Sequence, residues 1–76
     1  MNAQDKVVIA LSLAPDMTSR EIVRATGLAK STVAQRMWRL RRNGLVEYVG
    51  GKYNNRLTTA GEQRLDELFA QRARER

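Results

Sequence analysis

The residues with the most evident chemistry lie in the stretch 27–46, GLAKSTVAQRMWRLRRNGLV. Guanidinium, carboxamide and hydroxyl groups recur there, and such groups hydrogen-bond phosphates and the edges of bases. At about 3.6 residues per turn, Val33, Met37 and Leu40 fall on one side of a helix. The stretch therefore predicts a helix with one face in a core. Its far side carries Ser31, Gln35, Trp38, Arg39 and Arg42.

The basic residues are concentrated in one part of the chain. There are 14 Lys or Arg and 8 Asp or Glu, which gives a formal net charge of +6. Residues 20–56 hold nine of the basic and two of the acidic residues, so this segment is +7 and the remainder is −1. A solvated surface that aids solubility is the simple alternative. The concentration favours binding to a polyanion such as nucleic acid.

The composition argues against catalysis and metal binding. The chain contains no cysteine and no histidine, which removes thiolate and imidazole ligands, Cys or His nucleophiles and the usual near-neutral proton shuttle. No two acidic residues are spaced to suggest a pair of catalytic carboxylates. We therefore expect no enzymatic activity, no metal and no cofactor.

The length predicts one domain, 1–76, because a chain this short cannot divide its core. The longest apolar run, 7–11, is far below the about 20 residues of a membrane span and lacks the features of a signal peptide. We expect no membrane association and a cytoplasmic location. A core this small also suggests no small-molecule ligand.

The two ends of the chain predict helices. The first, 3–13, has Asn2 as a suitable N-cap. The last, 59–73, opens with Thr59 and Glu62 at capping-box spacing, in which the two side chains satisfy free amides at a helix start.

The middle of the chain predicts a pair of helices followed by a hairpin. Thr18 and Glu21 have capping-box spacing and open a helix at 18–26. Gly27 can adopt the left-handed conformation that ends it, and the second helix of the pair runs over 30–43. Two helices joined by a tight glycine turn form a helix-turn-helix.

After Gly44 the periodicity changes from that of a helix to that of a strand. Gly50–Gly51 is typical of a hairpin turn, so a short β-hairpin is predicted over 45–57. Its tip and far arm carry Lys52 and Arg56.

This order of elements, with the segments LAKSTVAQRMWRLRRNGLVEY and RLTTAGEQRLDEL, resembles the winged helix-turn-helix domain of small prokaryotic MarR and PadR-like transcription regulators. The resemblance implies an α+β, mostly helical fold with a three-helix core, a short two-stranded β-hairpin wing and a C-terminal helix. It also implies sequence-specific binding to double-stranded DNA, with the second helix of the pair in the major groove and the wing on flanking phosphates.

The resemblance carries over to particular positions. Gln35 and Arg39 are the best candidates for reading bases, since Gln can bond adenine and Arg guanine through two hydrogen bonds. Ser31 and Thr32 match groove-facing sites but could equally satisfy amides at the helix start. Arg36 also matches the groove, and the hairpin residues match the wing. The predicted DNA-contacting set is Lys30, Ser31, Thr32, Gln35, Arg36, Arg39, Arg42, Lys52 and Arg56.

Three residues near this helix leave specific expectations. Ala29 stands where a serine cap is common, so the helix should lack a side-chain cap. Arg41 is expected to pair with Glu47 or with an acid of the last helix. Trp38 lies about 140° from Val33 on the helical wheel. Half-buried packing against the first helix, a dimer contact and stacking on the DNA backbone all remain open for it.

A homodimer through the first and/or the C-terminal helix is expected, because a domain this small buries its apolar residues incompletely. Two recognition helices would then enter successive major grooves about 34 Å apart on a palindromic site. Two alternatives to a transcription regulator remain open: a protein–protein adaptor with the same fold, and a plasmid or phage replication or partition factor. A protein–protein adaptor has no need for the +7 charge of residues 20–56. A replication or partition factor would bind DNA through the same helix as a transcription regulator, so the sequence does not separate these two.

Overall fold

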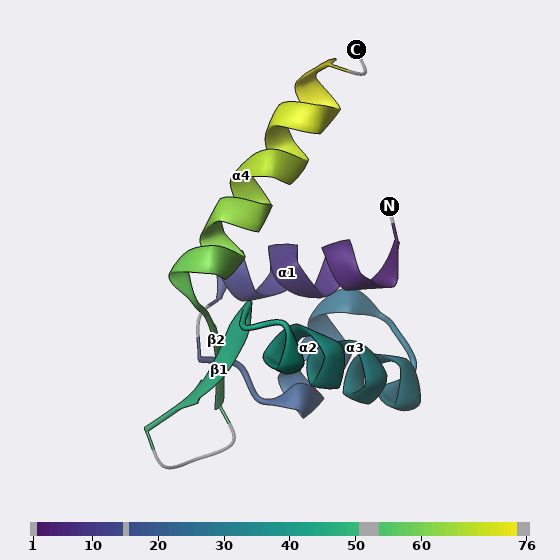
Figure 1. Ribbon diagram of the computed structural model, residues 1–76. Helices are drawn as coiled ribbons and strands as arrows, with labels where there is room; N and C mark the ends of the chain where they lie inside the picture. Colours follow the sequence, from purple (N-terminus) through teal and green to yellow (C-terminus); the bar gives the residue numbers. More distant parts are fainter. Residues whose placement is uncertain (1, 15, 51–53, 75–76) are drawn as a thin grey trace.

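The computed structural model describes residues 2–14, 16–50 and 54–74. Within these residues, four helices and one antiparallel hairpin follow in the order predicted from the sequence (Figure 1). The mostly helical α+β architecture is therefore confirmed. The elements are α1 Ala3–Leu13, α2 Ser19–Thr26, α3 Lys30–Arg42, β1 Val46–Val49, β2 Asn54–Leu57 and α4 Thr59–Arg74.

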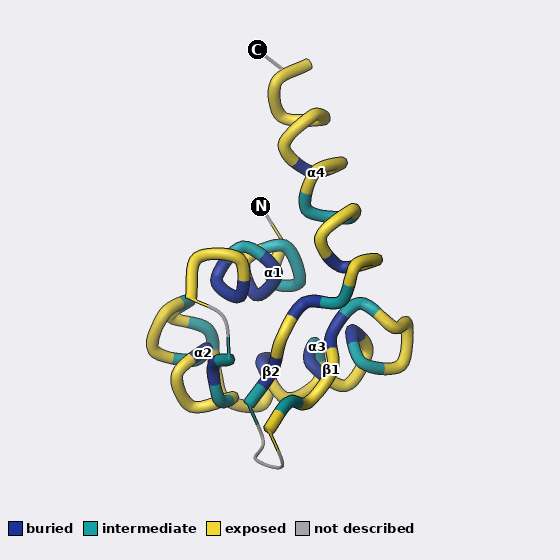
Figure 2. Tube along the Cα trace, turned by 90° about the vertical axis from the view of Figure 1, so that its left-hand side faces the viewer, coloured by how far each residue is buried: buried dark blue, intermediate teal, exposed yellow. Residues whose placement is uncertain are grey.

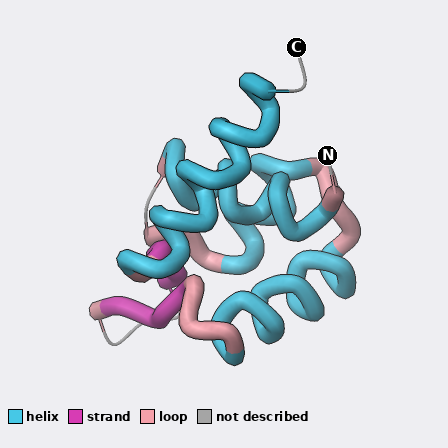
Figure 3. Tube along the Cα trace, turned by 45° about the horizontal axis from the view of Figure 1, so that its top comes forward, coloured by secondary structure: helices cyan, strands magenta, loops and turns pink. Residues whose placement is uncertain are grey.

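The core lies where α1 packs against the other three helices. In Figure 1, α1 crosses above α2 and α3, and the hairpin lies at one end of this layer. Figure 3 shows the same division, with the two strands at one side of the helices. Every element contributes apolar side chains to one cluster: Val7, Val8, Ala10, Leu11, Met17, Ile22, Val33, Met37, Leu40, Val46, Leu57 and Leu68.

The helix-turn-helix is held by local hydrogen bonds that the sequence encodes. Thr18 and Glu21 form the predicted capping box, with each side chain accepting from the other residue's backbone N–H at 3.2 Å. Because Thr18 is the cap, α2 begins one residue later, at Ser19. Gly27 has φ +71 and ends α2 in the left-handed conformation that glycine tolerates best.

The ends of α3 differ from each other. Ala29 makes no side-chain hydrogen bond to the helix start, as its methyl group requires. The helix ends at Arg42, one residue before the predicted end, because Asn43 is the C-cap. Gly44 follows with φ +73 and turns the chain into the hairpin.

The start of α4 corrects one sequence prediction. Thr58, and not Thr59, caps the helix: its hydroxyl oxygen accepts from the Gly61 N–H at 3.1 Å. The same hydroxyl donates to the Gly44 carbonyl at 2.6 Å. The cap at Thr58 thus joins the start of α4 to the chain reversal between α3 and β1, a tertiary contact that local spacing does not reveal.

The hairpin is paired to a third segment that the sequence did not predict. β1 and β2 are antiparallel, in a register that runs from Val46–Leu57 to Val49–Asn54. Met17, just before α2, forms an isolated bridge with Asn55, whose backbone N–H donates to the Met17 carbonyl at 2.8 Å. The base of the hairpin is therefore attached to the first half of the chain.

The far part of α4 extends away from the body of the molecule (Figure 1). Leu68 is its last buried residue, and Phe69 is 52% exposed. Figure 2 shows the exposed colour along most of this helix. In the described part of the chain, no helix has both the length and the apolar character needed to cross a membrane.

Candidate nucleic-acid interface

The orientation of α3 is fixed by its apolar side. Val33, Met37 and Leu40 are each 0% exposed. With these three side chains in the core, the opposite side of the helix must face outward. Five of the predicted contact residues on α3 are exposed: Lys30, Ser31, Gln35, Arg39 and Arg42. At about 1.5 Å per residue, they extend over roughly 18 Å of helix.

The exposed face of α3 carries uncompensated positive charge. Among residues 2–14, 16–50 and 54–74, neither Arg39 nor Arg42 forms an ion pair. The first turn of α3 contains no acidic residue, and Ala29 provides no side-chain cap. The backbone N–H groups of this first turn are therefore available to a ligand. A helix N-terminus with free N–H groups attracts anions. Charge and hydrogen-bond donors on this face therefore suit phosphate.

Two other predicted residues on α3 are less accessible. Thr32 and Arg36 are half-buried and lie on the flank of the helix. The Nε atom of Arg36 is buried without a hydrogen-bond partner in the described structure. Arg36 thus contributes less of its guanidinium to the outer face than Arg39 or Arg42.

Trp38 lies on the outward side, beside the basic residues. Its side chain is 54% exposed, and the guanidinium carbon of Arg42 lies 5.1 Å from the ring centroid. This is the range of a cation–π interaction. Of the three interpretations from the sequence, packing against α1 is the one that this position disfavours.

Arg41 has a structural role, but its partners differ from those expected. Its Nη1 donates to Asn55 Oδ1 at 3.1 Å, and its guanidinium lies 4.5 Å from the centroid of the Tyr48 ring. Within the described residues, Arg41 forms no ion pair with Glu47 or with an acid of α4, so the expected pairing is wrong there. Asn55 is fully buried and also donates from Nδ2 to the Met17 carbonyl at 3.0 Å. One buried amide therefore joins α3, β2 and the segment before α2.

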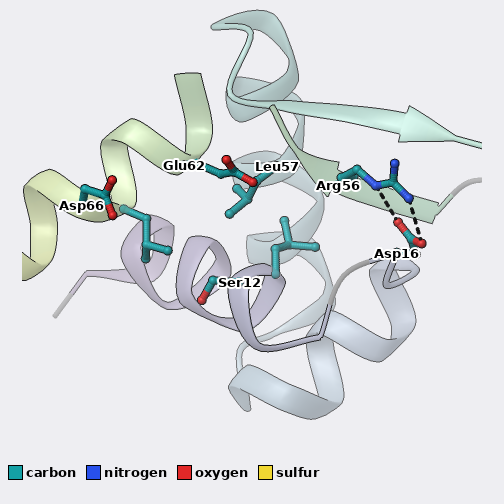
Figure 4. A pocket seen from close by; sticks show the side chains of 8 residues that line it. Ser12, Asp16, Arg56, Leu57, Glu62 and Asp66 are labelled. Atoms are coloured by element: carbon teal, nitrogen blue, oxygen red, sulfur yellow. Dashed lines mark hydrogen bonds and ion pairs between the residues drawn. The ribbon is translucent and has the colours of Figure 1, made fainter. Parts of the chain in front are cut away.

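The predicted wing residue Arg56 is engaged by an acid. Its Nε and Nη2 donate to Oδ1 and Oδ2 of Asp16 at 3.0 and 3.1 Å (Figure 4). The hydrogen bond with Asp16, and then its charge, raise the pKa of Arg56 above its ordinary value. The side chain is still 51% exposed. The other predicted wing residue, Lys52, lies outside the described residues.

A cleft of about 610 Å³ opens beside this ion pair, between α1, β2 and α4 (Figure 4). Leu11, Leu57 and Leu65 are among its lining residues, and Glu62 and Asp66 line it from α4. Within the described residues, no group of three or more acidic side chains is arranged to hold a metal ion. The cleft lies apart from the outer face of α3.

Sequence reasoning missed the residues that attach the hairpin to the rest of the molecule, Asp16 and Asn55. Asp16 and Asn55 act through partners 40 and 38 positions away along the chain. A weak signal did exist for Asn55, because an asparagine is uncommon inside a strand and requires hydrogen-bond partners when buried. Its partners were not predictable without the fold.

Comparisons with known proteins are consistent with this geometry. A family model described as winged helix-turn-helix DNA-binding matches residues 4–47. This range includes α1 from its second residue, all of α2 and α3, and the first two residues of β1. No match was found among curated proteins.

Several solved structures are similar over nearly the whole chain. The PcaV transcriptional regulator from Streptomyces coelicolor, crystallised with its natural ligand, has 32% identity and a TM-score of 0.87, and the match covers 97% of this chain and 56% of that one. A MarR family protein from Bacillus stearothermophilus has 30% identity and a TM-score of 0.85, with coverage of 99% and 55%.

A third structure supports the fold alone. The transcriptional regulator MosR from M. tuberculosis has 24% identity and a TM-score of 0.75, with coverage of 88% of this chain and 52% of that one. The chain thus spans just over half the length of these structures.

Proposed function

Because the chain belongs to the winged helix-turn-helix DNA-binding family, we propose that it regulates transcription by binding double-stranded DNA at a specific sequence. One observation carries the proposal. The apolar side of α3 is fully buried, while its opposite side presents Gln35, Arg39 and Arg42 to solvent without an ion pair in the described structure. The similarity to the PcaV transcriptional regulator over 97% of the chain, and to a MarR family protein over 99%, supports the regulatory role.

In the proposed complex, α3 lies in the major groove. Arg39 and Gln35 contact base edges, since they can form the paired hydrogen bonds that distinguish guanine and adenine. Lys30, Ser31 and the free N–H groups of the first turn contact phosphate at one groove wall. Arg42 contacts phosphate near the other end of the helix. Thr32 and Arg36 add to these contacts from the flank.

The hairpin contacts flanking phosphates in this proposal. Lys52 and Arg56 supply the positive charge, and Asp16 partly neutralises that of Arg56. The buried contacts of Asn55 support a fixed angle between the hairpin and α3, so both would meet the duplex in one orientation.

We further propose a homodimer on a palindromic site, in the cytoplasm. The exposed fractions of Leu13 on α1, 80%, and Phe69 on α4, 52%, support an interface on one or both of these helices. A two-fold axis would place the two α3 helices about 34 Å apart, in successive major grooves. Sedimentation of the protein, alone and bound to DNA, tests the proposed homodimer. A monomer that occupies a single half-site would exclude it.

The central test is selection of binding sites from a random duplex library, followed by titration of the selected site. We expect binding that weakens with salt at a log–log slope of about −0.9 for each phosphate contacted. Gln35→Ala should lose discrimination at one base pair, worth about 1–3 kcal/mol, while non-specific affinity persists. Gln71→Ala, which removes the same side chain from an exposed position on α4, is the matched control. Absence of binding to any duplex at low salt overturns the proposal.

A further inference from the structure

Trp38 is a large aromatic residue on the exposed, mostly polar side of α3. It is the only tryptophan of the chain and is 54% exposed, whereas Gln35, Arg39 and Arg42 on the same outer face are polar or basic. Gln35 lies one turn before it, and Arg42 lies one turn after it, so the three side chains share one side of the helix. A large apolar ring is thus presented beside polar and basic side chains, and Ala34, the exposed apolar residue one turn before it, adds only a methyl group.

The ring is also oriented. The Arg42 guanidinium lies over it at 5.1 Å from the centroid, which restricts the rotation of both side chains. A guanidinium that stacks through its face keeps its edge N–H groups for an acceptor. Arg42 can therefore contact phosphate while Trp38 is held against the helix, and the uncovered part of the indole remains available.

We propose that Trp38 contacts the 5-methyl group of a thymine in the major groove and so determines specificity at that base pair. This inference rests on the proposed function, because it requires α3 to lie in the groove. The thymine methyl is the apolar group that bases present in the major groove, and apolar side chains recognise it. The polar and charged neighbours of Trp38 cannot make this contact.

The geometry of the helix also places the thymine relative to the Gln35 contact. Trp38 is three residues beyond Gln35, which is about 4.5 Å along the helix axis. Base pairs are spaced by about 3.4 Å. The thymine therefore lies one or two base pairs from the one that Gln35 reads. The expected motif is two A·T base pairs that are adjacent or separated by one base pair.

The first experiment uses the intrinsic fluorescence of the single tryptophan. Anisotropy of labelled DNA measures binding, and Trp38 emission is recorded in the same titration with the selected duplex. We expect a change in emission intensity that saturates together with the anisotropy. Anisotropy that saturates while Trp38 emission stays unchanged overturns the inference and leaves the proposed function intact. Absence of any anisotropy change overturns the proposed function itself.

The second experiment removes the methyl group alone. Each thymine of the selected site is replaced in turn by deoxyuridine, which lacks only that methyl. We expect wild-type affinity to fall about fourfold at one position, the value of one buried methyl-sized group. Trp38→Gln should bind the thymine and deoxyuridine duplexes equally, and Trp38→Phe should retain part of the difference. Because Trp38 is exposed, these variants should unfold at the wild-type temperature.

The alternative contact gives a different result. If Trp38 stacks on the sugar–phosphate backbone, Trp38→Gln weakens binding to all duplexes by the same factor and no deoxyuridine position is special. That outcome overturns the thymine contact.

Discussion

Asp16 and Arg56 are 40 positions apart in the chain, yet they form a two-point ion pair at 3.0 and 3.1 Å at the base of the hairpin. Asp16 adopts φ +67, a left-handed conformation that asparagine and aspartate tolerate better than other residues with a side chain. The turn after α1 thus directs a carboxylate at the one basic side chain that the described part of the hairpin contains. This contact limits how freely Arg56 can reach a phosphate.

Replacing Asp16 with asparagine should therefore strengthen the hairpin's contact with DNA. Asparagine keeps the left-handed conformation but not the charge, so the Arg56 guanidinium becomes free to neutralise one more phosphate. The log–log slope of affinity against salt should become steeper by about 0.9. A titration series from low to moderate salt measures this slope.

The control for this change is Glu67→Gln on α4. It removes the same charge from an ion pair, here with Arg64 at 3.5 Å, but away from the hairpin. Its slope should remain that of the wild type. An unchanged slope for Asp16→Asn would contradict the view that Asp16 competes with phosphate for Arg56.

Asn55 should be essential for stability because its amide is fully buried. Asn55→Ala removes the acceptor of Arg41 and a donor to the Met17 carbonyl. The Met17 carbonyl keeps the hydrogen bond from the Asn55 backbone N–H, so one interaction is left unsatisfied. Such a loss costs about 1–3 kcal/mol, and the free energy of unfolding should fall by an amount in this range. Denaturant unfolding measures it.

Two further variants test whether the loss of stability comes from the hydrogen bonds of Asn55 or from any substitution in β2. Asn54→Ala, at a neighbouring half-buried position, should change stability by less than about 0.5 kcal/mol. Arg41→Ala combined with Asn55→Ala should cost less than the sum of the single changes, since both remove the same hydrogen bond. Additive losses would mean that the two side chains stabilise the protein independently.

The buried network marks the limit of what the sequence could predict. Periodic apolar residues such as Val33, Met37 and Leu40 located α3, because helix spacing is a local property. Gly27 and the Thr18–Glu21 pair located the ends of α2 for the same reason. The partners of Arg41 were not predictable, since Asn55 reaches it only after the hairpin folds back. Locally, Glu47 was the more obvious partner for an arginine.

The start of α4 gives a second example of this limit. Thr58 and Thr59 are chemically equivalent in the sequence, and the spacing to Glu62 favoured Thr59. The helix begins after Thr58, whose hydroxyl accepts from the Gly61 N–H and also donates to the Gly44 carbonyl. For the outer face of α3, in contrast, residue types and spacing were sufficient to nominate Gln35, Arg39 and Arg42, since exposure follows directly from the helical wheel.

Gly61 should not accept a side chain. A Cβ at this position would overlap the Leu45 carbonyl oxygen and lie 3.1 Å from a Leu57 methyl carbon. Gly61→Ala must therefore push α4 away from the hairpin and should cost about 1–3 kcal/mol. In a domain of this size, each kcal/mol lowers the melting temperature by about 4–8 °C.

Ala60→Ser tests whether any change in the first turn of α4 has this effect. Ala60 is exposed, so this substitution should move the melting temperature very little. If Gly61→Ala melted at the wild-type temperature as well, the close approach of α4 to Leu45 would not be required for the fold.

Ala29 offers a test in which stability and DNA binding should change in opposite directions. Its backbone, at φ −63 and ψ 147, already has the extended conformation of an N-cap, but its side chain makes no capping hydrogen bond. Ala29→Asp and Ala29→Ser should each stabilise the protein by about 0.5–2 kcal/mol, because both side chains can accept from the free N–H groups of the first turn. Aspartate gains further from the helix dipole.

If those N–H groups face a phosphate, the two variants should differ in DNA affinity. The carboxylate of Ala29→Asp would occupy the anion site and repel the backbone, so affinity should fall about tenfold or more. Ala29→Ser adds no charge and should bind more tightly than Ala29→Asp at every salt concentration. Thermal unfolding and fluorescence anisotropy measure the two effects on the same samples. An Ala29→Asp protein that is more stable and still binds DNA as tightly as the wild type would show that the start of α3 lies away from phosphate.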